Sequence, residues 1–92
     1  MKRYSAAEVS LLLPDWEYSN EGIEREFKFQ NFSEAFAFMT RVAMLAECAD
    51  HHPDWKNSYN KVHIRLTNHA EQALTEKDLL LAGKIDLLLM GK

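Results

Sequence analysis

Apolar and polar residues alternate along this chain with the periods of three helices and two hairpins. The first signal is Ser5 followed by Glu8, the spacing of a capping box, in which hydroxyl and carboxylate each bind a free amide at a helix start. A short helix is therefore expected from about Ala6 to Leu13. Pro14 should end it, because proline lacks the amide hydrogen that a helix interior needs.

The stretch "WEYSNEGIEREFKF" has the alternation of a β-hairpin. Its turn is expected at Asn20, Glu21 and Gly22. Beyond the turn, one side of the strand holds Ile23, Arg25, Phe27 and Phe29, and the other side holds Glu24, Glu26 and Lys28. One face of the sheet should therefore be buried and the other exposed to water.

A second helix is predicted in "EAFAFMTRVAMLAECA", with Ser33 as its N-cap. Its apolar residues recur at helical spacing: Phe36, Met39, Val42, Ala43 and Ala46. Pro53 disfavours helical angles at His52, so this helix should end by about Asp50.

The stretch "DWKNSYNKVHIRLTNH" predicts a second hairpin that turns at Asn60 and Lys61. In its second strand the two sides alternate again. The core side is expected to hold Val62, Ile64 and Leu66, and the polar side His63, Arg65, Thr67 and His69.

Thr75 followed by Asp78 indicates the start of a last helix, with an acid in the first turn. The following "KDLLLAGKIDLLLM" is apolar around much of its circumference, through Leu79, Leu80, Leu81, Leu87, Leu88, Leu89 and Met90. An apolar face too large for a monomer marks an interface, so we expect a homo-oligomer that uses this C-terminal helix. The alternative is a terminal helix buried within a monomer.

These elements predict an α+β fold in the order α-β-β-α-β-β-α, a four-stranded antiparallel sheet with three helices packed on one face. With 92 residues, 47% of them hydrophobic, residues 1–92 should form one domain. A net charge of -3 argues against a nucleic-acid partner. No window has the length and apolarity to span a membrane, no N-terminal run resembles a signal peptide, and Cys48 is single, so a cytoplasmic location is expected.

The candidate chemistry lies in three histidines. If the chain is extended from His52 onward, His51 and His52 point to opposite sides, which suits flanking a ligand better than chelating an ion. An antiparallel hairpin should return His69 toward His52 and Pro53. Three imidazoles near one rim of the sheet would suit proton transfer at neutral pH, because histidine titrates in that range.

Less specific interpretations compete with this one. His51 and His52 could simply lie at a solvated helix end, because cationic groups are favourable at helix C-termini. His63 is best taken as a residue of the polar face without a role. A zinc site could use His51, His69, Cys48 and Asp50, but the paired spacings typical of zinc are missing, so no metal and no cofactor are expected.

The spacing of several polar residues resembles the signature of the pterin-4a-carbinolamine dehydratases. The pattern runs through Glu47, the trio His51-His52-Pro53, Tyr59, His69 and Asp78. The flanking "FMTRVAMLAE", "DHHPDW" and "YNKVHIRL" strengthen it, and the resemblance extends from about Ser5 to the C-terminus. A pattern of seven spaced positions that includes three histidines is far more specific than any single part of it.

The resemblance implies removal of water from a 4a-hydroxytetrahydropterin, giving quinonoid dihydropterin during tetrahydropterin recycling. It also implies assembly as a homodimer or homotetramer through the C-terminal helix. By this resemblance His51, His52 and His69 are the catalytic groups. It further implies pterin contacts by Asp50, Trp55, Thr67 and Asn68, and supporting roles for Glu47, Pro53 and Asp78. Ala70 and Lys77 depart from the animal pattern, which has an acid after the third histidine and often an arginine before the last aspartate.

Other functions remain open at this point. Animal members of the family also act as dimerisation cofactors for a homeodomain transcription factor, so a non-catalytic binding role is the main alternative. A role in molybdopterin metabolism is another. Nothing in the sequence identifies the substituent of the natural pterin.

Overall fold

The computed structural model describes residues 2–90 and has the predicted order of elements. The helices are α1 (Ala6–Leu12), α2 (Phe32–Ala49) and α3 (Glu76–Met90). The strands are β1 (Glu17–Ser19), β2 (Gly22–Lys28), β3 (Asp54–Ser58) and β4 (Lys61–Leu66). They form an antiparallel sheet of order β1-β2-β4-β3, which confirms the α+β fold.

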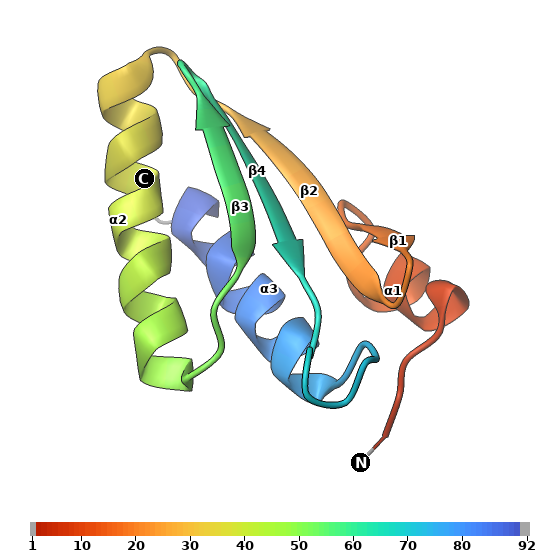
Figure 1. Ribbon diagram of the computed structural model, residues 1–92. Coiled ribbons are helices and arrows are strands. Elements are labelled where there is room, and N and C mark those ends of the chain that lie inside the picture. The colour runs from red at the N-terminus through yellow and green to blue at the C-terminus, as the bar shows by residue number, and fades with distance from the viewer. Residues whose placement is uncertain (1, 91–92) are drawn as a thin grey trace.

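The core lies between the sheet and the helices (Figure 1). Helices α2 and α3 pack side by side on the sheet, and α1 adjoins β1 and contributes Val9. The strand faces are as predicted, since the core holds Ile23 and Phe27 from β2 and Val62, Ile64 and Leu66 from β4. Within residues 2–90, no helix has both the length and the apolar character needed to cross a membrane.

The N-terminal helix confirms its predicted cap. The Ser5 hydroxyl accepts from the Glu8 amide at 3.3 Å, and the Glu8 carboxylate accepts from the Ser5 amide at 3.0 Å. Helix α1 ends at Leu12, one residue before the predicted end, and Leu13 is its C-cap.

The two hairpin turns are each shifted slightly from the prediction. Asn20 and Glu21 form the first turn with φ of 49° and 60°, whereas Gly22 already belongs to β2. A Cβ at Gly22 would lie 2.7 Å from Nη2 of Arg65, so a larger residue there would require the Arg65 guanidinium to move. The predicted second turn at Asn60 and Lys61 is wrong by one residue, since Lys61 pairs with Ser58 and the turn is Tyr59 and Asn60.

Helix α2 also begins earlier than predicted. Its N-cap is Asn31, not Ser33, because the Asn31 side chain accepts from the Glu34 amide at 2.9 Å and Ser33 lies within the first turn. The end by Asp50 is confirmed: Asp50 is the C-cap, in the left-handed region with φ of 50°.

The buried face of α2 differs in part from the predicted one. It consists of Ala35, Phe38, Val42 and Ala46, with Met39 partly buried. Phe36 and Ala43 were placed on that face but are exposed. Each follows a core position by one residue, which rotates it about 100° around the helix axis.

The apolar residues of α3 are divided between core and surface. Leu81 is buried and Leu79, Leu88 and Leu89 pack partly against the core, whereas Leu80, Leu87 and Met90 are exposed. Helix α2 exposes a comparable set, namely Phe32, Phe36 and Met44. The exposed apolar surface is therefore not confined to the C-terminal helix, and self-association through that helix stays a prediction.

Candidate active site

The residues of the candidate site gather at one end of the molecule. Figure 1 shows that α2 ends, β3 begins and β4 ends at this same end. The left-handed Asp50 turns the chain out of α2, and the His51 amide still donates to the Ala46 carbonyl at 3.0 Å. His52 and Pro53 then lead into β3.

His51 forms a buried pair with Asp78 of α3. Its Nε2 lies 2.5 Å from Asp78 Oδ1, and the two side chains are 10% and 0% exposed. The other carboxylate oxygen of Asp78 accepts from the Thr75 amide at 2.9 Å. A histidine that donates through Nε2 to a carboxylate keeps Nδ1 as its nitrogen for proton transfer.

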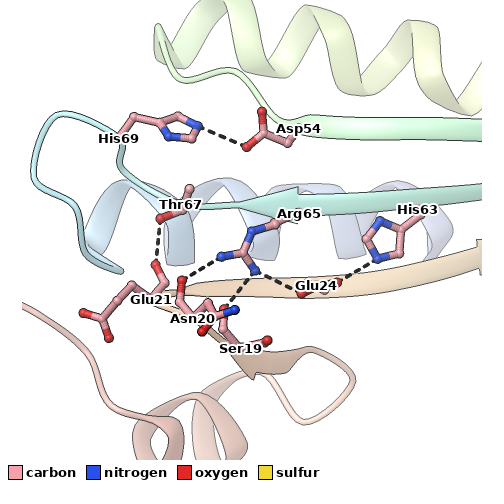
Figure 2. Close-up of polar contacts among 9 residues, drawn as sticks. All are labelled: Ser19, Asn20, Glu21, Glu24, Asp54, His63, Arg65, Thr67 and His69. Atoms are coloured by element: carbon pink, nitrogen blue, oxygen red, sulfur yellow. Dashed lines mark hydrogen bonds and ion pairs between the residues drawn. The ribbon is translucent and has the colours of Figure 1, made fainter.

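The other two histidines have exposed carboxylate partners. His52 Nε2 lies 2.9 Å from Glu47 Oε1, and His69 Nε2 lies 3.0 Å from Asp54 Oδ2 (Figure 2). In both pairs more than half of each side chain is exposed to solvent. Exposed pairs of this kind contribute little to stability but favour one ring orientation.

The expected return of His69 toward the α2–β3 junction agrees with its contact. Its partner Asp54 directly follows Pro53 and is two residues from His52. Each of the three rings nevertheless bonds to a different carboxylate.

A surface cavity of about 400 Å³ adjoins His69. It is lined by Asn20, Glu21, Arg65, Thr67, His69 and Gln72, and neither His51 nor His52 belongs to this lining. The Thr67 hydroxyl donates to the Glu21 carbonyl at 2.7 Å. The Tyr18 hydroxyl donates to the Glu21 carboxylate, and this bond raises the pKa of Tyr18.

Arg65 fixes the first hairpin turn beside this cavity. Its guanidinium donates to the carbonyls of Ser19 and Asn20, at 2.8 and 2.7 Å, and to Glu24 at 3.0 Å (Figure 2). The other Glu24 oxygen bonds to His63 at 2.9 Å. This cluster on the open sheet face was missed from the sequence, where Arg65 and His63 were only polar-face residues.

Asp54 was also missed as the partner of His69. Its register opposite Arg65 puts it at the end of β4, on the polar parity of β3. Strand alternation could therefore have suggested it. Of the other positions in "DHHPDW", Asp50 is the exposed C-cap of α2 and Trp55 packs partly against the core.

Asn68 does not face the cavity beside His69. It is buried, and its side-chain amide donates to the Thr75 hydroxyl at 3.2 Å. Its side-chain oxygen accepts from the Glu71 amide at 3.2 Å. Cys48, weighed as a metal ligand, is exposed, and residues 2–90 contain no group of three or more His, Cys, Asp or Glu placed to hold a metal ion.

Comparison with known proteins gives one consistent family. A family model described as pterin 4 alpha carbinolamine dehydratase matches residues 2–88. A protein of Prochlorococcus marinus strain NATL2A, provisionally named as a pterin-4-alpha-carbinolamine dehydratase, is 54% identical over 76 residues, 83% of this chain and 80% of that protein. A Chloroflexus aurantiacus protein with the same provisional name is 49% identical and covers 94% and 96%.

Comparison with solved structures agrees with this family. The crystal structure of a transcriptional coactivator/pterin dehydratase from Brucella melitensis has a TM-score of 0.86 and 39% identity, over 95% of this chain and 98% of that chain. A pterin dehydratase-like RuBisCO assembly factor of the alpha-carboxysome has a TM-score of 0.66 over 79% and 84%. At 22% identity the second shares the fold alone.

Proposed function

Because the chain belongs to the pterin 4 alpha carbinolamine dehydratase family, we propose that it removes water from a 4a-hydroxytetrahydropterin to give the quinonoid dihydropterin. One observation supports this most directly: at one end of the fold, His51, His52 and His69 each bond through Nε2 to a separate carboxylate. Such pairing leaves Nδ1 of each ring as the nitrogen for exchanging protons with a substrate.

The reaction needs one proton donor and one acceptor. The N5 lone pair of the pterin forms the C4a=N5 bond while the C4a–O bond breaks, and an imidazolium donates a proton so that the oxygen leaves as water. The resulting cationic iminium then gives a proton to a neutral imidazole. Each well-placed acid or base contributes about a hundredfold or more to such a step.

The carboxylates would have supporting roles in this scheme. Asp78 and Glu47 would orient the rings of His51 and His52, and Asp54 would do the same for His69. Thr67, Asp50 and Trp55 are proposed to contact the pterin. A place in tetrahydropterin recycling and a cytoplasmic location belong to the same proposal.

The experiment is a stopped-flow assay that generates 4a-hydroxytetrahydropterin and follows quinonoid dihydropterin. We expect the wild-type chain to accelerate dehydration, and His69→Ala and His52→Ala to lower kcat by about a hundredfold each while remaining folded. Wild-type turnover in both variants would remove the proposed mechanism. No acceleration by the wild-type chain would remove the function.

A second candidate function is binding to a protein partner. The observation that favours it is the set of exposed apolar side chains Phe32, Phe36 and Met44 on α2, of which Phe32 and Phe36 are in ring contact, since exposed apolar side chains mark interaction surfaces. The Brucella relative is described as a coactivator as well as a dehydratase. A second copy of this chain is our proposed occupant, through α3 or these exposed residues of α2.

A further inference from the structure

A buried hydrogen-bond network connects the His51 pair to the loop that carries His69. Asp78 Oδ1 lies 2.5 Å from His51 Nε2, and Asp78 Oδ2 accepts from the Thr75 amide at 2.9 Å. The Thr75 hydroxyl accepts in turn from the Asn68 side chain at 3.2 Å. Because Asn68 directly precedes His69, the network extends from one candidate catalytic histidine to the neighbour of another.

The members of this network are enclosed by protein. Asp78 and Thr75 are 0% exposed and Asn68 is 8% exposed. A threonine at a helix start ordinarily uses its hydroxyl to accept from an amide of the first turn, but here the hydroxyl accepts from Asn68. The Asn68 backbone also pairs with Ala73, with an N to O distance of 3.1 Å. The loop is therefore bonded to Ala73 and Thr75, which directly precede α3.

We propose that Asn68 and Thr75 are positioning residues that fix Asp78, and through it His51, relative to the loop of His69. This inference rests on the proposed function. It also changes the role expected for Asn68, whose side chain bonds within the protein instead of contacting the pterin. A buried polar network with every member satisfied has few alternative arrangements, so removing one bond loosens the others.

The decisive variant is Thr75→Val, which removes the hydroxyl but keeps both the side-chain shape and the amide that binds Asp78. We expect kcat for dehydration to fall about tenfold with KM changed by less than about twofold, because small misplacements of catalytic groups have effects of this size. Thr75→Ser restores the hydroxyl and should recover most of the rate. Ile85→Val, a buried apolar change in the same helix, should keep kcat within about twofold of wild type.

A second measurement does not depend on activity. The ¹⁵N chemical shifts of the His51 ring, recorded without substrate, should move in Thr75→Val and stay unchanged in Ile85→Val. If the wild-type chain shows no dehydration, the proposed function fails, but these chemical shifts still test whether Thr75 positions His51. Unchanged His51 shifts in Thr75→Val overturn the inference, as does wild-type kcat in that variant or an equal loss in Thr75→Ser. If Thr75→Val does not fold, Asn68→Ala breaks the same bond and is judged by the same criteria.

Discussion

Replacing His51 with alanine should destabilise the protein far more than replacing either of the other two candidate catalytic histidines. The His51 side chain is 10% exposed and its partner Asp78 is 0% exposed, so His51→Ala leaves one buried carboxylate oxygen without its donor. Breaking a buried pair by removing one partner costs about 3–5 kcal/mol. The pair of His69 and Asp54 is 72% and 57% exposed, and losing it costs about 1 kcal/mol or less.

These free-energy differences are large enough to be measured by urea unfolding. A chain of 92 residues has a total stability of roughly 5–14 kcal/mol, so His51→Ala removes a large share of it. With a urea m value of about 1–2 kcal/mol/M, the unfolding midpoint should fall by about 1.5–5 M in His51→Ala and by less than about 1 M in His69→Ala. Protein concentration must be equal in all samples, because self-association would shift the midpoint.

The double variant His51→Ala/Asp78→Asn separates charge from packing. Asparagine removes the buried charge and keeps an oxygen that accepts from the Thr75 amide, so the double variant should recover more than half of the loss. Equal midpoints for His51→Ala and His69→Ala would refute the reasoning, since burial would then not distinguish the two pairs.

Three further changes test other parts of the fold. Gly22→Ala should cost about 1–3 kcal/mol, because its Cβ would displace the Arg65 guanidinium from its hydrogen bonds to Ser19, Asn20 and Glu24. Gly83→Ala, with nothing within 4 Å of its Cβ, should stabilise α3 by about 1 kcal/mol, and urea unfolding of both variants measures the contrast. Hydrogen bonds from the Ser5 amide and Lys2 lower the pKa of Glu8. The destabilisation caused by Glu8→Gln should therefore have its full size above about pH 4.5 and disappear as the pH falls through the pKa of Glu8 in the folded protein. An equal destabilisation at all pH values would contradict this. Leu87→Glu on α3 and Phe36→Glu on α2 should identify the self-association face by light scattering, and an unchanged mass in both variants would exclude both faces.

Local patterns in the sequence were sufficient for the element order and the strand faces. The alternation of Val62, Ile64 and Leu66 predicted a buried side, because strand residues two apart must share a face. The capping box of Ser5 and Glu8 was readable for the same reason, since its two hydrogen bonds join residues three apart. The N-cap of α2 was misassigned because Asn31 and Ser33 are both good caps, and only the backbone conformation distinguishes them.

What the tertiary structure decided is which groups meet across long stretches of chain. Asp54 reaches His69 across 15 residues and Arg65 reaches the Ser19 carbonyl across 46, and both contacts depend on strand register. Burial likewise separates the His51 pair from the His69 pair, although both are a histidine beside a carboxylate. The one-dimensional pattern specifies which side chains are available, whereas their partners and their access to water follow from the packing of distant elements.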